Sequence, residues 1–420
     1  MRLSLILVGL FFNASLSFAQ VPKKKYQGQG GVQEVNTSPR PIQQQYQSTF
    51  AFEDADIYIS NEFDGARLNG ALMKEDTLMV WITPENAPIN PSPWYAFKIW
   101  SGEPKEALVK FTYQNAKHRY FPKLSHDGKN WQPLDSANYQ EFNKGEADFG
   151  PNSLPQSVVI KLSLNSDTLW VAGQELQTSQ HIFAWIDSLS QQSYISHADI
   201  GESRLGRPMR SVKISEAKRE DKIVFVFGRQ HPPEVTGWLA MKAFVETLTG
   251  DSKLAKKFRK EYTTYVVPLM NPDGADLGHW RHSAGGVDLN RDWSQFHHPE
   301  TRAVRDFLRN KTAEGAKLYF GIDFHSTWDD IYYTLDSVSV TNTPGLMAEW
   351  LSSIESNIPD YEINAKGSVN ATGVSKNFLF REFGAESLVY EVGDNTPRPF
   401  VQQKGEVAAE QLMRLLLDRE

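Results

Sequence analysis

Hydrophobic and polar positions follow two different patterns along the chain, and the change from one pattern to the other divides the chain into two predicted domains. From about residue 49, short apolar runs such as "TLMVWI", "WYAFKIW" and "SVVIKLSL" are separated by turn-forming stretches such as "ENAPINPSP". Short alternating runs with frequent turns are typical of antiparallel strands. We therefore predict an antiparallel β-sandwich domain over residues 49–175.

After residue 176 the pattern becomes one of strands alternating with helices. Strand character is found in "KIVFVFG", "YTTYVVPLM", "AKLYFGIDF" and "ESLVY", and helical spacing in "EVTGWLAMKAFVETL" and "PETRAVRDFLRN". This order predicts an α/β domain over residues 176–420, with its functional residues at the ends of the strands.

The first 48 residues differ in composition from both predicted domains. Residues 1–19, "MRLSLILVGLFFNASLSFA", combine one arginine, an apolar run and small residues before Ala19, which predicts a cleaved secretory signal peptide. Residues 20–48 are polar and rich in Gln, Gly and Pro, so we expect a flexible, mobile lead-in. The predicted location is therefore periplasmic or secreted, and an uncleaved interfacial anchor is the alternative.

Composition narrows the choice of partners. The formal charge is −7 and the pI about 5.9, which argues against a nucleic-acid partner. The chain has no cysteine, so it has no disulfide framework. The apolar run near the start is too short to span a bilayer, and no later run reaches the ~18 apolar residues that a membrane span needs, so we expect no membrane insertion of the mature chain. The oligomeric state is not indicated by any of these features.

Candidate metal ligands follow two of the predicted strands. In "GRQHPPEVTG", His231 and Glu234 are separated by two prolines that stiffen the corner between strand and helix. A second strand runs into "GIDFHSTWDD" and brings His325 to its end. Two histidines and a carboxylate fit a catalytic zinc set with an open fourth position. By itself the His-x-x-Glu pair is equally compatible with an ordinary helix start.

A longer motif favours the zinc site over an ordinary helix start. Residues 271–293, "NPDGADLGHWRHSAGGVDLNRDW", closely resemble the zinc carboxypeptidase superfamily, which contains the digestive carboxypeptidases A and B. The stretch is most similar to the cytosolic carboxypeptidase branch, and it lies between the His-x-x-Glu pair and the second histidine as in that family. The resemblance implies an α/β catalytic domain with a mixed sheet, preceded in this branch by a β-sandwich.

Several site residues are implied by the resemblance alone. It implies that His231, Glu234 and His325 bind Zn²⁺ and that Asp288 orients the first histidine. Arg281 matches the arginine that stabilises the developing oxyanion in the family.

The resemblance also implies how the substrate is gripped and how the water is activated. Asn290 and Arg291 match the pair that binds the free C-terminal carboxylate, as a planar guanidinium can. Glu391, in "SLVYEVGDNTP", matches the general base that takes a proton from the water. The competing acidic residues are Glu382, Glu386 and Asp394.

The chain departs from the family at one point and carries a clue at another. The loop "NAKGSVNATGVSKNFLF" lacks the tyrosine that usually closes over the substrate, and Tyr361 lies thirty positions before Glu391, which is too early. In "SKNFLFREFG", Lys376 matches a basic residue that is associated with acidic C-terminal residues in the cytosolic branch. The alternative is a plain surface lysine. His297 and His298 are read as surface residues.

Together these features predict a secreted zinc metallocarboxypeptidase, and Lys376 suggests a preference for acidic C-terminal residues. A first alternative keeps the zinc site and changes the substrate to the stem peptides of the cell wall, so the expected partner is a peptide or a peptidoglycan peptide. A second alternative is a zinc-binding or glycan-binding module with little catalysis, suggested by the missing tyrosine and the extra β-domain. The stretch "SHDGKNW" in that domain resembles strings found in sugar-binding sandwiches, but a hairpin with a packed Trp131 also explains it, so we expect the β-domain to support folding or shape the cleft rather than to bind a glycan.

Overall fold

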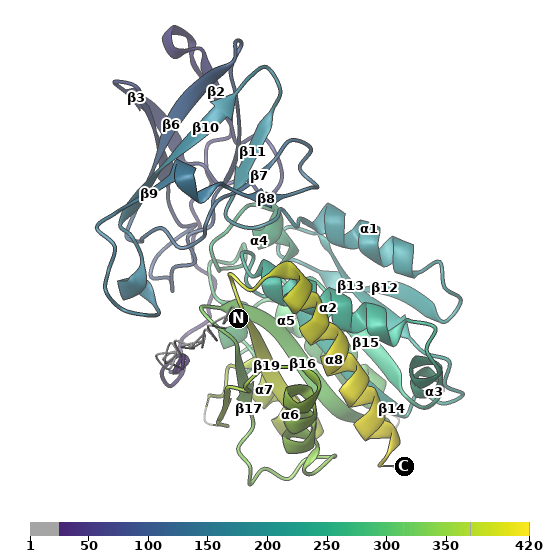
Figure 1. Cartoon of the computed structure of the whole chain (residues 1–420). Coiled ribbons are helices and arrows are strands. Elements are labelled where there is room, and N and C mark those ends of the chain that lie inside the picture. Colours follow the sequence, from purple (N-terminus) through teal and green to yellow (C-terminus); the bar gives the residue numbers. More distant parts are fainter. Residues whose placement is uncertain (1–24, 314, 370, 420) are drawn as a thin grey trace, which may run out of the picture.

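The computed structural model describes residues 25–313, 315–369 and 371–419, and they form two adjoining domains (Figure 1). The predicted signal peptide lies outside the described residues. In the described ranges, no helix is both long enough and apolar enough to cross a membrane.

The N-terminal domain is a sandwich of two sheets. The first sheet has the order β1 (Thr49–Phe52), β2 (Ile57–Ser60), β5 (Ala96–Trp100), β11 (Leu169–Ala172), β7 (Lys123–Ser125) and β8 (Gln132–Pro133). The second has the order β3 (Gly70–Lys74), β4 (Thr77–Ile82), β6 (Lys105–Tyr113), β10 (Ser157–Leu164) and β9 (Tyr139–Phe142).

The predicted antiparallel sandwich is confirmed, with one parallel pair. Every ladder between neighbouring strands of the two sheets is antiparallel except that of β4 and β6. Between these two strands the chain crosses to the other sheet as β5, and such a crossover permits parallel pairing. Alternate residues of β4, Leu78, Val80 and Ile82, are fully buried in the core that the two sheets share, as the period of two predicts.

The C-terminal domain is built on a mixed sheet of eight strands. Their order is β12 (Ile195–Glu202), β13 (Pro208–Ile214), β15 (Thr263–Val267), β14 (Lys222–Gly228), β16 (Lys317–Thr327), β19 (Glu386–Gly393), β17 (Ile331–Thr334) and β18 (Ala365–Gly367). Strands β15, β14, β16 and β19 are parallel to one another, so their carboxyl ends meet at one edge. The predicted α/β class with a mixed sheet is confirmed.

Helices cover both faces of this sheet (Figure 1). They are α1 (Ser179–Leu189), α2 (Val235–Leu248), α3 (Lys253–Glu261), α4 (Pro272–Asp276), α5 (Pro299–Thr312), α6 (Leu346–Asn357), α7 (Ser375–Phe383) and α8 (Arg398–Leu417). In β14, Val224 and Val226 belong to the apolar core on one face, whereas Phe225 and Phe227 belong to the core on the other. A strand buried on both faces explains why "KIVFVFG" is continuously apolar.

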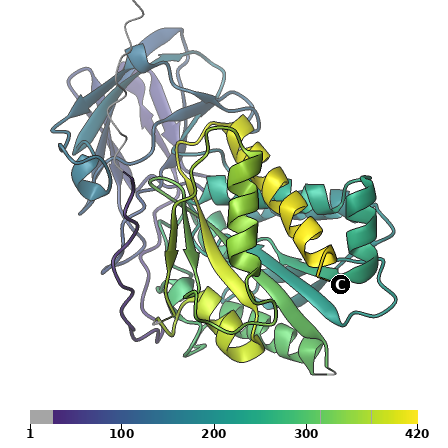
Figure 2. The same cartoon turned by 60° about the horizontal axis from the view of Figure 1, so that its bottom comes forward.

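Residues 25–48, expected to form a mobile lead-in, run alongside both domains before they enter β1 (Figure 2). The Arg40 amide donates to the Gly285 carbonyl at 2.8 Å, and the Gln43 amide donates to the Glu85 carbonyl at 2.6 Å. His298 is fully buried and its Nε2 donates to the Thr37 carbonyl at 2.9 Å. The surface position predicted for His298 is therefore wrong, because this segment covers it. The mobility of the segment stays a prediction.

Candidate active site

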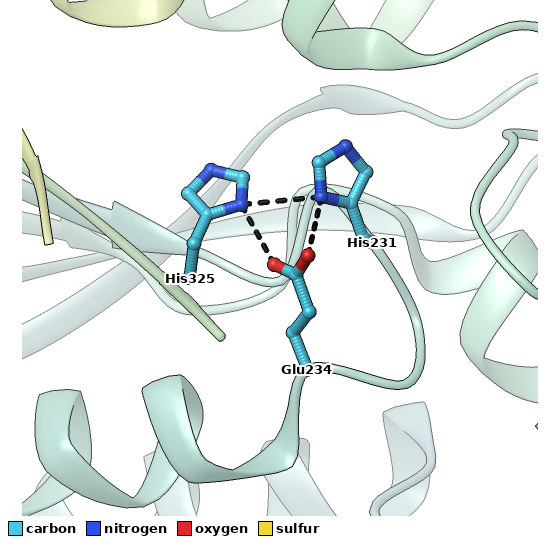
Figure 3. Close-up of side chains that lie close together, drawn as sticks. All are labelled: His231, Glu234 and His325. Atoms are coloured by element: carbon cyan, nitrogen blue, oxygen red, sulfur yellow. Dashed lines mark hydrogen bonds and ion pairs between the residues drawn. The ribbon is translucent and has the colours of Figure 1, made fainter. Parts of the chain in front are cut away.

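His231, Glu234 and His325 point toward one another at the carboxyl edge of the central sheet (Figure 3). His231 lies in the turn after β14, Glu234 is the residue directly before α2, and His325 belongs to β16. Gly237 brings α2 against β16, because a Cβ at this position would lie only 2.4 Å from the His325 carbonyl oxygen. The helix and the strand can therefore place their ligands side by side.

The three side chains converge through their ligand atoms. His231 Nδ1 lies 2.8 Å from one carboxylate oxygen of Glu234, and His325 Nδ1 lies 2.7 Å from the other. The two Nδ1 atoms are 3.2 Å apart. All three residues are almost fully buried, and their ligand atoms lie within 4.8 Å of one another.

Carboxylates on the far side of each imidazole set its tautomer. His231 Nε2 lies 2.8 Å from Asp288 Oδ1, and His325 Nε2 lies 2.9 Å from Asp323 Oδ2. An ionised carboxylate can only accept, so each Nε2 carries the proton and each Nδ1 turns a lone pair inward. The donor set therefore fits Zn²⁺, which is held by neutral imidazoles and carboxylates.

The charges around the ligands favour a cation. Burial alone would lower the pKa of His325, but the negative charges of Asp323 and Glu234 outweigh it and raise that pKa well above its usual value. Asp323 was missed in the sequence analysis. A usable feature was present, because Asp323 stands two positions before His325 on one strand and residues so spaced share a face.

Arg281 is anchored on the carboxylate that orients His231. Its Nε donates to Asp288 Oδ2 at 2.8 Å. Burial opposes the charged form of Asp288, but Arg281 and His231 outweigh it and hold its pKa well below the usual value. The guanidinium is thus fixed beside the metal ligands, where it can stabilise a carbonyl oxygen that becomes negative.

Asn290 and Arg291 lie on a single 3₁₀ turn, Leu289–Arg291, which begins after Asp288. The Asn290 Oδ1 accepts from the Ser375 amide at 2.9 Å, so its Nδ2 is the group available to donate to a ligand. The Arg291 guanidinium lies 3.7 Å from Asp288 and is 19% exposed. Both residues border a pocket of about 200 Å³, together with His231, Arg281 and Glu391.

Glu391 lies beside the metal ligands because β19 pairs with β16 in a register that sets Glu391 opposite His325. Burial and then the negative charge of Glu234 raise the pKa of Glu391 to about 7. Its buried Oε2 has no hydrogen-bond partner among the described residues. A buried carboxylate with a raised pKa and a vacant oxygen is suited to accept a proton from water.

The competing acidic residues lie elsewhere. Glu382 pairs with Arg309 at 2.7 Å near the surface. Glu386, at the opposite end of β19, accepts from Thr341. Asp394 is held by Arg119 of the sandwich at 2.7 Å.

Lys376 lies in the same pocket and is buried, so the alternative of a surface lysine is wrong. It belongs to the first turn of α7, and its Nζ donates to the Ser368 carbonyl and to Asn377 Oδ1. Burial is the main cause that lowers its pKa to about 8. At neutral pH the pocket therefore retains a cation.

The sandwich domain holds the loop that carries Arg281, which the sequence analysis did not predict. Trp280 is buried in the sandwich core, and its Nε1 donates to the Trp94 carbonyl at 3.1 Å. The carboxylate of Glu85, itself fully buried, accepts the amides of Trp280, Arg281 and His282 at 2.8, 3.0 and 2.6 Å. Nothing in the stretch "TPENAP" marks Glu85 for this position, because the contact joins segments about 195 residues apart.

Two tyrosines, Tyr333 and Tyr26, border the cavities at the site, and Tyr361 does not. The Tyr361 hydroxyl donates to Asp330 at 2.9 Å, and Tyr361 does not border the pocket. Tyr333, on β17, borders it beside Glu391 and Lys376. Tyr26, near the start of the described chain, borders the adjoining larger cavity.

Comparison with known proteins places this geometry in a family. A family model described as zinc carboxypeptidase matches residues 182–409. Mouse cytosolic carboxypeptidase 6 is 28% identical over 156 residues, which are 34% of this chain and 29% of that protein. Mouse cytosolic carboxypeptidase 3 is 34% identical over 141 residues, 32% of this chain and 14% of that protein. The chain thus matches less than a third of the length of these relatives.

Solved structures extend the likeness to the whole fold. A metallo-carboxypeptidase from Burkholderia cenocepacia has a TM-score of 0.70 at 19% identity, covering 87% of this chain and all of that one. A metallo-carboxypeptidase from Pseudomonas aeruginosa has a TM-score of 0.66 at 18% identity, covering 86% of this chain and all of that one. The two-domain architecture, with the sandwich first, is therefore shared.

Proposed function

Since the chain belongs to the zinc carboxypeptidase family, we propose that it hydrolyses the last peptide bond of peptides that end in a free carboxylate. The observation that carries this proposal is the pocket of about 200 Å³, where His231, Arg281, Asn290, Arg291 and Glu391 meet. A site for a terminal carboxylate adjoins a metal ligand, an oxyanion-stabilising cation and a general base, which is what removal of a terminal residue requires.

Zinc bound to His231, Glu234 and His325 would polarise the scissile carbonyl and lower the pKa of a water molecule. Glu391 takes a proton from the attacking water and returns it to the amine of the departing residue. Arg281 stabilises the negative charge that develops on the carbonyl oxygen.

The remaining side chains of the pocket, Asn290, Arg291 and Lys376, bind the terminal residue of the substrate. Arg291 and the Nδ2 group of Asn290 hold the terminal carboxylate and so place the last peptide bond at Glu391. Lys376 favours glutamate or aspartate as the terminal residue, because a buried cation gains more from an opposite charge than from an apolar group. We also propose that the protein acts after secretion, which rests on the apolar N-terminal run of the sequence.

Mass spectrometry of a peptide pool that differs only in its last residue tests this function. Zinc-loaded protein should release single C-terminal residues, Glu and Asp first, and Glu391→Ala should release none. Amidated peptides should resist wild-type enzyme, and Arg291→Ala should lose far more activity on free than on amidated ends. Equal losses on both would overturn the role of Arg291. Activity on purified muropeptides alone would favour the cell-wall alternative.

A further inference from the structure

The N-terminal strap, residues 25–35, is part of the dark purple chain in Figure 2, and nearly all of its residues border the cavities at the active site. Its first anchor is Tyr26, which is only 8% exposed. The Tyr26 ring packs on Phe149 of the sandwich at 5.4 Å between centroids, and its hydroxyl lies 3.3 Å from Thr327 Oγ1 of the catalytic domain. The Asn364 Nδ2 donates to the Tyr26 carbonyl at 2.9 Å. The strap therefore touches both domains at one point.

A second anchor lies three residues farther along the strap, at Gln29. The Gln29 amide donates to the Tyr333 hydroxyl at 2.7 Å, and Lys366 Nζ donates to the Gln29 carbonyl at 3.1 Å. Gly28 has a φ of +71°, and a Cβ there would lie 2.7 Å from the Tyr333 hydroxyl. Only glycine fits a backbone that passes so closely over this tyrosine.

Two cavities meet beneath the strap. The pocket of about 200 Å³ contains Lys376 and Glu391 and has room for one terminal residue. A larger cavity of about 740 Å³ lies on the sandwich side and reaches Glu234 and Thr327. Both are bordered by residues 29–32 of the strap, and both are bordered by Arg281 and Arg291. The passage from one cavity to the other therefore runs between these arginines and the strap.

We propose that the strap roofs the substrate path and selects peptide ends that can be threaded beneath it. The inference rests on the proposed function, because a peptide whose last residue occupies the small pocket must place its preceding residues in the larger cavity. Such a peptide passes under residues 29–32. The enzyme then accepts slender, unfolded chain ends and rejects an end that emerges directly from a folded domain.

The construction of the strap suits this role. Gly30 and Gly31 carry no side chain that could block the path, and most of residues 30–36 are exposed. The next anchors follow at Thr37, whose hydroxyl donates to Asp292 at 2.5 Å, and at Arg40. On this proposal, a roof fastened at both ends directs the substrate along the cavity on the sandwich side.

The experiment opens the roof in the folded holoenzyme. A protease recognition sequence is inserted after Glu34, which is exposed and borders neither cavity. Zinc-loaded protein is assayed before and after cutting and gel filtration. Mass spectrometry shows whether the cut N-terminal segment has dissociated from the enzyme. If it stays bound, the same insertion is made in the Tyr26→Ala variant, which lacks the first anchor and should release the segment. The control is the chain without the insertion, treated with the same protease.

Three substrates share the same last residues: a free tetrapeptide, a folded domain with a tail of three residues, and that domain with a tail of about twelve. We expect intact enzyme to trim the tetrapeptide and the long tail and to spare the short tail. Cutting should raise kcat/KM on the short tail at least tenfold and change the other two less than threefold. An equal gain on all three, or no gain on the short tail, would overturn the proposal.

Failure of the proposed function would be separately visible. Intact holoenzyme would then release no residue from the tetrapeptide. In that case the strap is tested by measuring how tightly the same three ligands bind to the Glu391→Gln variant before and after cutting. Cut protein that binds the short tail more tightly, with the tetrapeptide unchanged, supports the roof, and equal binding before and after cutting overturns it.

Discussion

The inner wall of the cleft, which carries His231, Glu234 and His325, is held by buried hydrogen bonds to charged carboxylates, such as those of Asp288 and Asp323. The outer wall, formed by the N-terminal strap, is held by the Tyr26 hydroxyl, by the Gln29 bonds to Tyr333 and Lys366, and by an exposed ion pair between Lys25 and Glu362. Buried charge-assisted hydrogen bonds are about twice as strong as neutral ones, whereas an exposed ion pair contributes only about 0–1 kcal/mol. We therefore expect the inner wall to be positioned more rigidly than the strap.

In this comparison the sandwich domain counts as part of the inner wall, although its residue Glu85 lies about 195 positions before the loop that carries Arg281. Glu85 and the sandwich core hold Trp280 and, through it, Arg281. A β-domain that supports the oxyanion-stabilising residue differs from an appended binding module. We expect substitutions on the inner wall to change kcat and those on the strap to change which substrates enter.

The largest effect is expected for Glu391→Gln. Loss of the general base should lower kcat by about 10³-fold, within the range such groups contribute, and zinc content should stay at the wild-type level because Glu391 is not a ligand. Steady-state kinetics and metal analysis check this. Glu386→Gln, on the same strand but away from the pocket, is the matched control. Loss of zinc from Glu391→Gln would contradict the assignment.

Glu85→Ala tests whether the sandwich belongs to the inner wall. It leaves three buried amides without their acceptor, and the free energy of unfolding should fall by at least about 3 kcal/mol, since each orphaned group costs ~1–3 kcal/mol. Displacement of Arg281 should also lower kcat about 10- to 100-fold with little change in zinc content.

Two controls separate support of Arg281 from a general loss of stability. Glu103→Ala removes an exposed carboxylate of the same domain and should change neither quantity. Glu85→Gln keeps one acceptor oxygen and should be intermediate in kcat. A destabilised Glu85→Ala protein with wild-type kcat at low temperature would show that the sandwich does not position Arg281.

A smaller effect is expected from the charge of Lys376. Its pKa of about 8 means that the cation is present below this pH and is lost as the pH rises through it. The ratio of kcat/KM for peptides ending in Glu and in Gln should therefore be highest near pH 6–7 and fall above pH 8. Lys376→Met should lower this ratio about tenfold, which corresponds to ~1.4 kcal/mol. A ratio independent of pH in wild type would refute the role of Lys376.

The smallest effect is expected for Tyr26→Phe on the outer wall. Removing the hydroxyl that faces Thr327 deletes one neutral hydrogen bond, so the free energy of unfolding should fall by less than about 1 kcal/mol. Denaturant unfolding measures this, and kcat on short peptides should not change. A loss as large as that of Glu85→Ala would mean that the strap is part of the rigid core, and the contrast between the two walls would fail.

Most of the architecture and the metal set could be predicted because they depend on local patterns. The β14 strand, the stiff corner at Pro232 and Pro233 and the helix after it follow from neighbouring residues. The two-domain order follows from the strand and helix patterns, and the zinc ligands follow from the family resemblance carried by residues 271–293; both are confirmed. The roles of Asn290, Arg291 and Glu391 stay predictions, but the structure brings all three into one pocket. Asp323 was within reach from its spacing to His325.

By itself, the sequence determined the fold class, the order of the domains and the kind of chemistry, because strand and helix periods and a contiguous motif are properties of short stretches. Only the tertiary structure decided that Glu85 holds the Arg281 loop, that Lys376 is buried and that residues 29–32 border the substrate cavities. These contacts join segments that lie up to several hundred positions apart. A buried carboxylate and a glycine-rich stretch acquire a role only from the neighbours that folding brings to them, and the local pattern of a chain does not specify those neighbours.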